Sequence, residues 1–310
     1  MGLFGLHLNL GPTSGAYLIG TFVSNVLLGA TGVQMYIYFR SFQDPLFTKI
    51  RVLILLVLEL LHGVLSMQAQ YHYLIDNFGN PLALTSSIWS SNIMFSITGG
   101  IILVVHWSYA IRIFYISGSK ILVPIVIVTI SLAIFSLGIC LSVELFINPS
   151  LLNLTGVREN LAKAGLTMAA FNDFLIASTL SFHLHRARTG FKKTDKILDK
   201  LTTYAVNNGI LTSLTDIVAL AFIFAFPESL YSVAISQVIG SLYSNSLMAT
   251  LNSRQRPNVD DPSSFEFSSR ALSTFGAAAN PQIPVSTKPA VERSFLMSFD
   301  SSRSVAVESV

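Results

Sequence analysis

Three long stretches of this sequence contain no Asp, Glu, Lys or Arg at all: residues 1–39, 77–111 and 229–253. A helix needs about 20 mostly apolar residues to cross the hydrocarbon core of a bilayer, and each stretch is long enough to contain one. Only 11% of the 310 residues are charged and 52% are hydrophobic, whereas soluble domains contain about 25% charged residues. Because a water-exposed surface needs more charge than this, the sequence predicts an integral membrane protein.

Length and apolar content predict seven transmembrane helices in an all-α polytopic bundle. The fifth and sixth spans each contain one Asp, and inserting an Asp at the centre of a transmembrane helix costs about 2.5–3.5 kcal/mol. The several Leu, Ile and Phe residues of each span offset this cost, because each contributes about 0.3–0.6 kcal/mol in favour of insertion. The bundle is expected to cover residues 16–251, after a short extracellular segment 1–15. The predicted spans are Ala16–Phe39, Val52–Tyr71, Ser87–Tyr109, Ile121–Ile147, Ala164–Leu184, Leu201–Ala225 and Leu230–Leu251.

The basic residues predict how the spans are oriented. The first, third and fifth connections and the C-terminal segment lie on one side of the membrane in this arrangement, and they contain 17 of the 19 Lys and Arg residues. Only Arg158 and Lys163 lie on the other side of the membrane. Cytoplasmic loops carry the excess of Lys and Arg, so the N-terminus is expected outside and the C-terminus in the cytoplasm. The sequon Asn153-Leu154-Thr155 lies in an outer connection and is a glycosylation candidate.

The cytoplasmic side is predicted to have a basic surface and a disordered tail. The segment 252–310 is rich in serine, contains equal numbers of acidic and basic residues, and lacks sustained apolar periodicity, a composition typical of disorder. The basic connection between the fifth and sixth spans either lies against anionic lipid headgroups or forms a docking surface for a cytoplasmic protein. The residues assigned to this cytoplasmic face are Arg186, Arg188, Lys192, Lys193, Asn245 and Asn252.

Four titratable side chains fall inside predicted spans: Glu59, His62, Asp173 and Asp216. Ionisable groups inside a membrane are costly and are candidates for a functional site. We expect them to converge on a cavity for a proton, a cation or a polar ligand. The alternative is that each forms interhelical hydrogen bonds, worth about 0.6–2 kcal/mol per bond, and serves packing alone.

The sequence gives no support for an enzyme or for a bound cofactor. It contains no nucleotide-binding loop, no nucleophile elbow and no HExxH motif. The last span contains no lysine that could hold retinal. We place His106, His183 and His185 near the cytoplasmic ends of the third and fifth spans, where interfacial packing is favoured over a metal site. No metal and no nucleic-acid partner are expected.

Two segments near the end of the predicted bundle have distinctive amino-acid sequences. The first is Arg188-Thr189-Gly190-Phe191-Lys192-Lys193-Thr194-Asp195, and the second runs from Leu242 to Arg254 as LYSNSLMATLNSR. Over about residues 165–255 the chain resembles a family of fungal multi-pass membrane proteins catalogued as domain of unknown function 6534, common in mushroom-forming fungi. The resemblance implies a seven-span membrane protein and implies no activity, ligand or catalytic residue.

Three functional hypotheses follow for a multi-pass protein of the plasma membrane or an endomembrane. The favoured one is a non-enzymatic, receptor-like sensor with a basic cytoplasmic face. The second is a proton-coupled or small-solute transporter or channel that uses the intramembrane carboxyl groups. The third is a membrane-embedded lipid enzyme, for which the sequence supplies no catalytic cluster.

Overall fold

The computed structural model describes residues 11–80, 83, 86–118, 120–150, 156–186, 192–227 and 229–253, and for residues 192–202 and 205 it describes the backbone alone. The Ser-rich tail beyond Ser253, the sequon at Asn153 and Arg188 lie outside the described residues.

The described residues form seven α-helices, with single π-helical turns at Gly11–Gly15 and His72–Asp76. Every predicted span corresponds to one of these helices. Their bounds are α1 Ala16–Ser41, α2 Leu46–Tyr71, α3 Trp89–Ile116, α4 Leu122–Ile147, α5 Val157–Arg186, α6 Lys192–Ala225 and α7 Tyr231–Asn252.

Several helices extend beyond their apolar cores. Helix α2 begins at Leu46 instead of Val52, α3 ends at Ile116 instead of Tyr109, and α6 begins at Lys192 instead of Leu201. The predicted bounds stopped near charged residues. The helical backbone can continue past such residues because long Lys and Arg side chains can extend from an intact helix toward water.

Five segments within the described residues are long and apolar enough to cross a membrane: Gly11–Ser41, Leu46–Asp76, Trp89–Ile116, Leu122–Ile147 and Val206–Ala225. Helices α5 and α7 are outside this set. Helix α5 begins with the charged turn Arg158-Glu159, and α7 contains many Ser, Asn and Gln residues. Their polarity lowers the mean hydropathy without shortening the helices.

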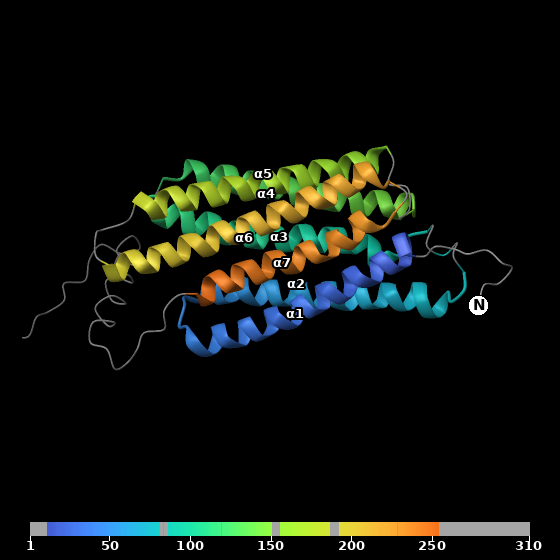
Figure 1. The fold of residues 1–310 in the computed structure, drawn as a ribbon, viewed down its shortest axis with the longest axis horizontal. Coiled ribbons are helices and arrows are strands. Elements are labelled where there is room, and N and C mark those ends of the chain that lie inside the picture. The colour runs from blue at the N-terminus through green and yellow to red at the C-terminus, as the bar shows by residue number, and fades with distance from the viewer. Residues whose placement is uncertain are drawn as a thin grey trace, which may run out of the picture. The chain divides into compact units, whose positions relative to one another are not determined.

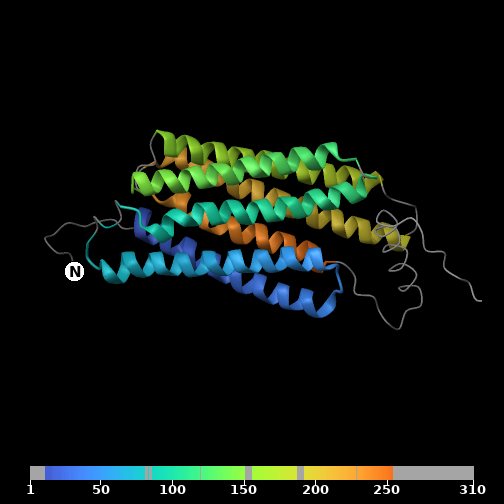
Figure 2. The ribbon, with the colours of Figure 1, turned by 180° about the vertical axis from the view of Figure 1, so that it is seen from behind.

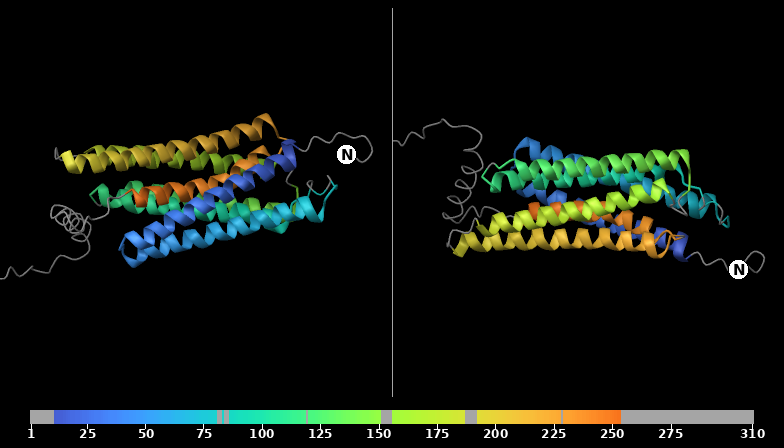
Figure 3. Two further views of the ribbon diagram at one scale, coloured as in Figure 1. Left: turned by 60° about the horizontal axis from the view of Figure 1, so that its bottom comes forward. Right: turned by 90° about the horizontal axis from the view of Figure 1, so that it is seen from above.

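Consecutive helices run antiparallel, and α7 packs against α1, α2, α3 and α6. Figure 3 shows α7 running between α1 and the α5–α6 pair, and Figure 2 shows α2, α3 and α4 from the opposite side. The ends of α1, α3 and α5 therefore lie at the same end of the bundle as the starts of α2 and α6. This end carries Arg40, Lys49, Arg112 and Arg186.

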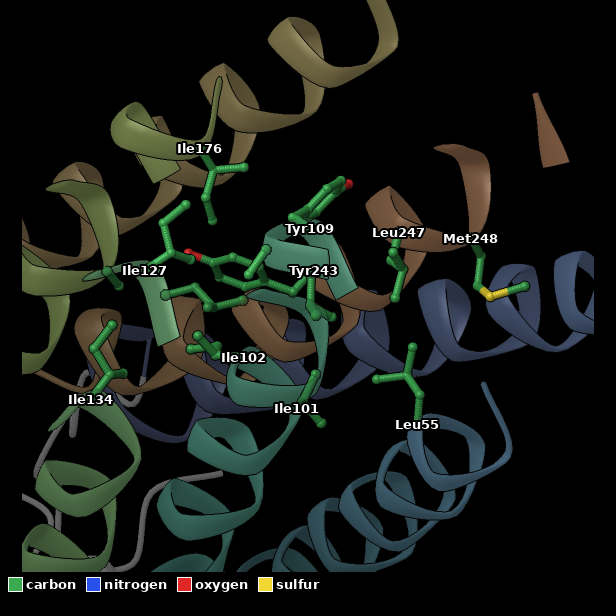
Figure 4. Packing of buried hydrophobic residues seen from close by; sticks show 14 of the residues in the cluster. Leu55, Ile101, Ile102, Tyr109, Ile127, Ile134, Ile176, Tyr243, Leu247 and Met248 are labelled. Carbon is green, nitrogen blue, oxygen red and sulfur yellow. The ribbon is translucent and has the colours of Figure 1, made fainter. Parts of the chain in front are cut away.

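The bundle is apolar outside and partly polar inside. Large apolar side chains such as Val26, Leu53 and Phe174 point outward and are more than half exposed, whereas many Ser, Thr, Asn and carboxyl side chains are buried. This is the reverse of a soluble protein, and it fits a lipid-facing surface. The interior also contains a large apolar cluster, which Figure 4 shows with Ile101, Ile102 and Tyr243.

Small residues allow two helices to approach closely. A Cβ atom at Gly20 of α1 would lie 2.5 Å from the carbonyl oxygen of Ala234 in α7, so only glycine fits there. In α7, Gly240 faces Thr98 and Ile101 of α3 instead of α1. The small residues of α7 thus serve contacts with more than one neighbour.

Candidate functional site

A buried polar group surrounds Asp173 and takes side chains from five helices. Each of its acidic and basic members belongs to the buried stripe of its own helix. The stripe of α3 contains Ile102, His106, Tyr109 and Ile113, that of α5 contains Ala169, Asp173, Ile176 and Leu180, and that of α6 contains Thr212, Asp216, Ala219 and Ile223. Their spacing of three to four residues is that of one helix face. We define the Asp173 cluster by its residues His106, Ser131, Asn172, Asp173, Thr212, Asp216 and Tyr243.

Both carboxyl oxygens of Asp173 have hydrogen-bond partners. Nε2 of His106 lies 3.0 Å from Oδ1. The hydroxyl of Tyr243 donates to Oδ2 at 2.8 Å, and the hydroxyl of Thr212 donates to the same oxygen. Three side chains from α3, α6 and α7 thus converge on one carboxyl group of α5, and both of its oxygens are paired.

The second ring nitrogen of His106 faces α4 and α5. Nδ1 lies 3.0 Å from the amide nitrogen of Asn172 and 3.0 Å from Oγ of Ser131. Because the Asn172 amide donates to Nδ1, the ring proton is assigned to Nε2, where it points at Asp173. The ring of His106 also packs edge-on against Tyr243, with centroids 5.3 Å apart. The imidazole is therefore fixed on both edges.

Tyr243 connects Asp173 to a second acid. Its hydroxyl oxygen lies 3.1 Å from Oδ2 of Asp216 in α6, in addition to the contact with Asp173. The other oxygen of Asp216 has no hydrogen-bond partner among the residues that the structure describes. Two buried carboxyl groups thus share one phenol, and Asp216 is the one with fewer donors.

Glu59 lies in a separate polar group between α2 and α7. Its carboxyl oxygens accept hydrogen bonds from the hydroxyls of Ser244 at 2.5 Å and of Ser241 at 3.1 Å. The hydroxyl oxygen of Ser241 also lies 3.0 Å from that of Ser24 in α1. We call Glu59, Ser24, Ser241 and Ser244 the Glu59 cluster. Its contacts are with serine hydroxyls, which can also donate back to their own helix.

His62 lies one helical turn after Glu59, and both belong to the buried stripe of α2. It is only 1% exposed, and neither of its ring nitrogens has a hydrogen-bond partner among the described residues. It lines a small cavity together with residues of α1, α3 and α7. Of the four titratable residues singled out in the sequence, His62 alone lines this cavity.

The structure therefore divides the four residues between the two sides of α7. Asp173 and Asp216 meet through Tyr243 on the side of α5 and α6, whereas Glu59 and His62 lie toward α1 and α2. The cavity that His62 lines has none of Glu59, Asp173 and Asp216 among its lining residues. Among the described residues, no group of three or more His, Cys, Asp or Glu side chains is placed to hold a metal ion.

His106 is where the sequence interpretation was wrong. It was placed near the cytoplasmic rim with His183 and His185, but it is fully buried and contacts Asp173. The reason is that α3 continues to Ile116, which puts His106 ten residues before the end of the helix. The spacing of His106 with Ile102 and Tyr109 was the signal that could have located it.

The residues assigned to a cytoplasmic face have different environments. Arg186 is exposed at the end of α5, and only the backbone of Lys192 and Lys193 is described. Asn245 donates to the carbonyl oxygen of Leu27 at 2.9 Å, and Asn252 donates to that of Gln34 at 2.8 Å. Both amides therefore connect α7 to the backbone of α1.

Comparison with known proteins gives a match to one protein family. No curated protein and no solved structure is significantly similar to the chain. Residues 169–256 match a family of unknown function, DUF6534. The matched segment contains both acids of the Asp173 cluster and all of its other members except His106 and Ser131.

Proposed function

We propose that all seven helices cross the bilayer, with the basic end of the bundle in the cytoplasm. Helices α5 and α7 have 30 and 22 residues, which correspond to about 45 and 33 Å at 1.5 Å per residue. Both exceed the hydrocarbon thickness of about 30 Å. Their lower hydropathy follows from polar side chains that bond to other helices inside the bundle, and Phe171, Phe174 and Phe182 give α5 an apolar outer face.

We infer that this membrane protein is a proton transporter or channel whose proton site is the Asp173 cluster. The observation that carries the proposal is the position of one phenol, that of Tyr243, between Oδ2 of Asp173 and Oδ2 of Asp216. A phenol has one proton and donates one full hydrogen bond. If both acids were ionised, one would face the phenol oxygen without a proton between them.

A proton on Asp216 completes this chain of hydrogen bonds. Asp173 is then the ionised partner, because it accepts from His106, Thr212 and Tyr243. Asp216 donates its proton to the phenol oxygen, and its unpartnered Oδ1 is the carbonyl oxygen of a neutral acid. Burying one charge with three donors and one neutral acid costs much less than burying two carboxylates.

Movement of this proton would change the hydrogen bonds that connect α6 to its neighbouring helices. Thr212 and Asp216 are both in α6, and Asn208 of the same helix donates to the carbonyl oxygen of Ser246 in α7 at 2.9 Å. Loss of the Asp216 proton would place two carboxylates around Tyr243 and favour separation of α6 from α7. Such coupling of a titrating acid to helix packing is what a proton-driven transport cycle requires.

Reconstitution into liposomes that contain a pH-sensitive dye tests the proposal. The wild-type chain should acidify the lumen when a proton gradient is imposed, and Asp216→Asn should abolish this proton flux. Glu144→Gln is the control, because Glu144 is bonded to Asn148 near the end of α4. This variant should retain the flux. A wild-type rate equal to that of empty liposomes would reject the transporter. A wild-type chain without flux that nevertheless changes conformation with pH would instead favour a sensor that uses the same proton site.

A further inference from the structure

The acid of the Glu59 cluster is as deeply buried as those of the Asp173 cluster. Glu59 lies near the middle of the 26-residue helix α2 and is 1% exposed. Its oxygen Oε1 lies 2.5 Å from Oγ of Ser244, and Oε2 lies 3.1 Å from Oγ of Ser241. Its hydrogen-bond partners among the described residues are therefore two neutral hydroxyls of α7.

No positive charge compensates this carboxyl group. None of the ion pairs between described residues includes Glu59. His62 does not contact it, because neither ring nitrogen has a hydrogen-bond partner among these residues. In the helices packed against α2, His106, Tyr109 and Tyr243 have partners other than Glu59. The remaining ionisable residues of α1, α2, α3 and α7 lie within two turns of a helix end, among them Arg40, Lys49, Arg51 and Arg112.

A neutral carboxylic acid suits this environment better than a carboxylate does. An ionised carboxylate that is buried without a cationic partner is costly, and such a group usually takes up a proton instead. A protonated carboxyl group has one donor and one acceptor oxygen, which matches the two contacts of Glu59. The hydrogen between Glu59 and Ser244 can be carried by either oxygen at the observed distance, so the missing positive charge decides where it lies.

We propose that Glu59 is a second proton-binding site, in which the neutral acid donates to Ser244 and accepts from Ser241. With the proton on Glu59, the hydroxyl of Ser244 is free to donate to the backbone of its own helix, as serines in helices do. The Glu59 cluster shares no residue with the Asp173 cluster, so this proposal does not rest on the proposed function.

Both sites nevertheless contact one short segment of α7. Ser241 and Ser244 bond to Glu59 on the side of α2, whereas Tyr243 bonds to the two acids on the side of α5 and α6. Loss of the Glu59 proton would leave a negative charge between α2 and α7 without a positive partner. The protonation state of Glu59 therefore bears on how α2 packs against the helix that also carries Tyr243.

Infrared difference spectroscopy of the full-length chain at neutral pH tests the site. Glu59→Gln keeps the size and the hydrogen-bonding groups of a neutral acid, and it should remove the carbonyl band of one protonated carboxylic acid without removing a carboxylate band. Ser241→Ala keeps the acid and removes the donor to its carbonyl oxygen, so the same band should move to higher frequency. Ser142→Ala is the matched control, because Ser142 is buried and bonds to Ser96 of α3. It should leave the band in place.

Loss of a carboxylate band in Glu59→Gln would overturn the proposal, because Glu59 would then be ionised. An unchanged protonated-acid band in Ser241→Ala would also overturn it, and this variant decides the matter if Glu59→Gln fails to fold. Asp216→Asn changes a different acid and should leave the Glu59 band intact. Failure of the Asp173 cluster as a proton site is therefore distinguishable from failure at Glu59.

Discussion

His106 of α3 and Asp173 of α5 face each other inside the bundle, with Nε2 and Oδ1 3.0 Å apart and both side chains buried. Each is held by further contacts, since Asn172 and Ser131 contact Nδ1 of His106, and Thr212 and Tyr243 donate to Asp173. Removing either partner leaves the other buried with a hydrogen-bonding position unfilled. The pair is therefore the part of the cluster most sensitive to single substitutions.

We expect His106→Leu to lower the free energy of unfolding by about 1–3 kcal/mol, the usual cost of leaving a buried hydrogen-bonding group without its partner. Asp173→Leu should cost a similar amount, and the double variant should cost clearly less than the sum of the two. Thermal unfolding in detergent, followed by circular dichroism, measures all three. Additive effects would mean that the two side chains do not stabilise each other.

Two glycines of α1 provide a matched test of helix packing. Gly20→Ala should destabilise the bundle by about 1–3 kcal/mol, because the new Cβ would lie 2.5 Å from the carbonyl oxygen of Ala234. Gly29→Ala meets no atom within 4 Å and should be neutral or stabilising by up to about 1 kcal/mol, since alanine is the better helix former. The same unfolding assay distinguishes them. Equal stability of the two variants would contradict the close approach of α1 and α7.

The Glu59 cluster is expected to be a structural link between α2 and α7. Glu59→Leu removes the acceptor of Ser241 and Ser244 and should cost about 1–2 kcal/mol, as interhelical hydrogen bonds in membranes do. Glu59→Gln should cost less, because its amide oxygen can accept from one serine while its amide nitrogen donates to the other. The prediction fails if the Leu variant unfolds at the temperature of the wild-type chain.

Single cysteines at the two ends of α5 test whether this polar helix crosses the membrane. The starting chain has Cys140, the only cysteine in the sequence, replaced by serine. Val157→Cys and Arg186→Cys then lie at opposite ends of α5, and both positions are exposed. We expect a membrane-impermeant thiol reagent added to intact cells to label position 157 and to leave position 186 unlabelled until the cells are opened. Labelling of both positions in intact cells would contradict the proposed topology.

The helical fold was largely predictable because the bilayer imposes length and apolarity on each span separately. All seven predicted spans coincide with a helix, and Glu59 and His62, which are three residues apart in the sequence, share the buried face of α2. The bounds were less predictable, because Lys49 and Arg112 look like loop residues in a sequence although a helix can carry them to the membrane surface.

The partners of the buried polar groups were not predictable. Whether Asp173 pairs with His106, with Glu59 or with Asp216 depends on which helices become neighbours, and no local pattern records that α3 contacts α5. In the sequence Tyr243 is one of several polar residues of the last span, whereas in the structure it joins the two acids. Its role becomes visible only when α6 and α7 are packed.

The central claim is that Asp216 carries a proton while Asp173 is ionised, and infrared difference spectroscopy of the wild-type chain against Asp216→Asn tests it directly. The difference spectrum should show the carbonyl stretching band of one protonated carboxylic acid, present in the wild type and lost in the variant. Glu144→Gln serves as the control and should remove a carboxylate band instead. Loss of a carboxylate band in Asp216→Asn, with no change in the protonated-acid band, would contradict the account.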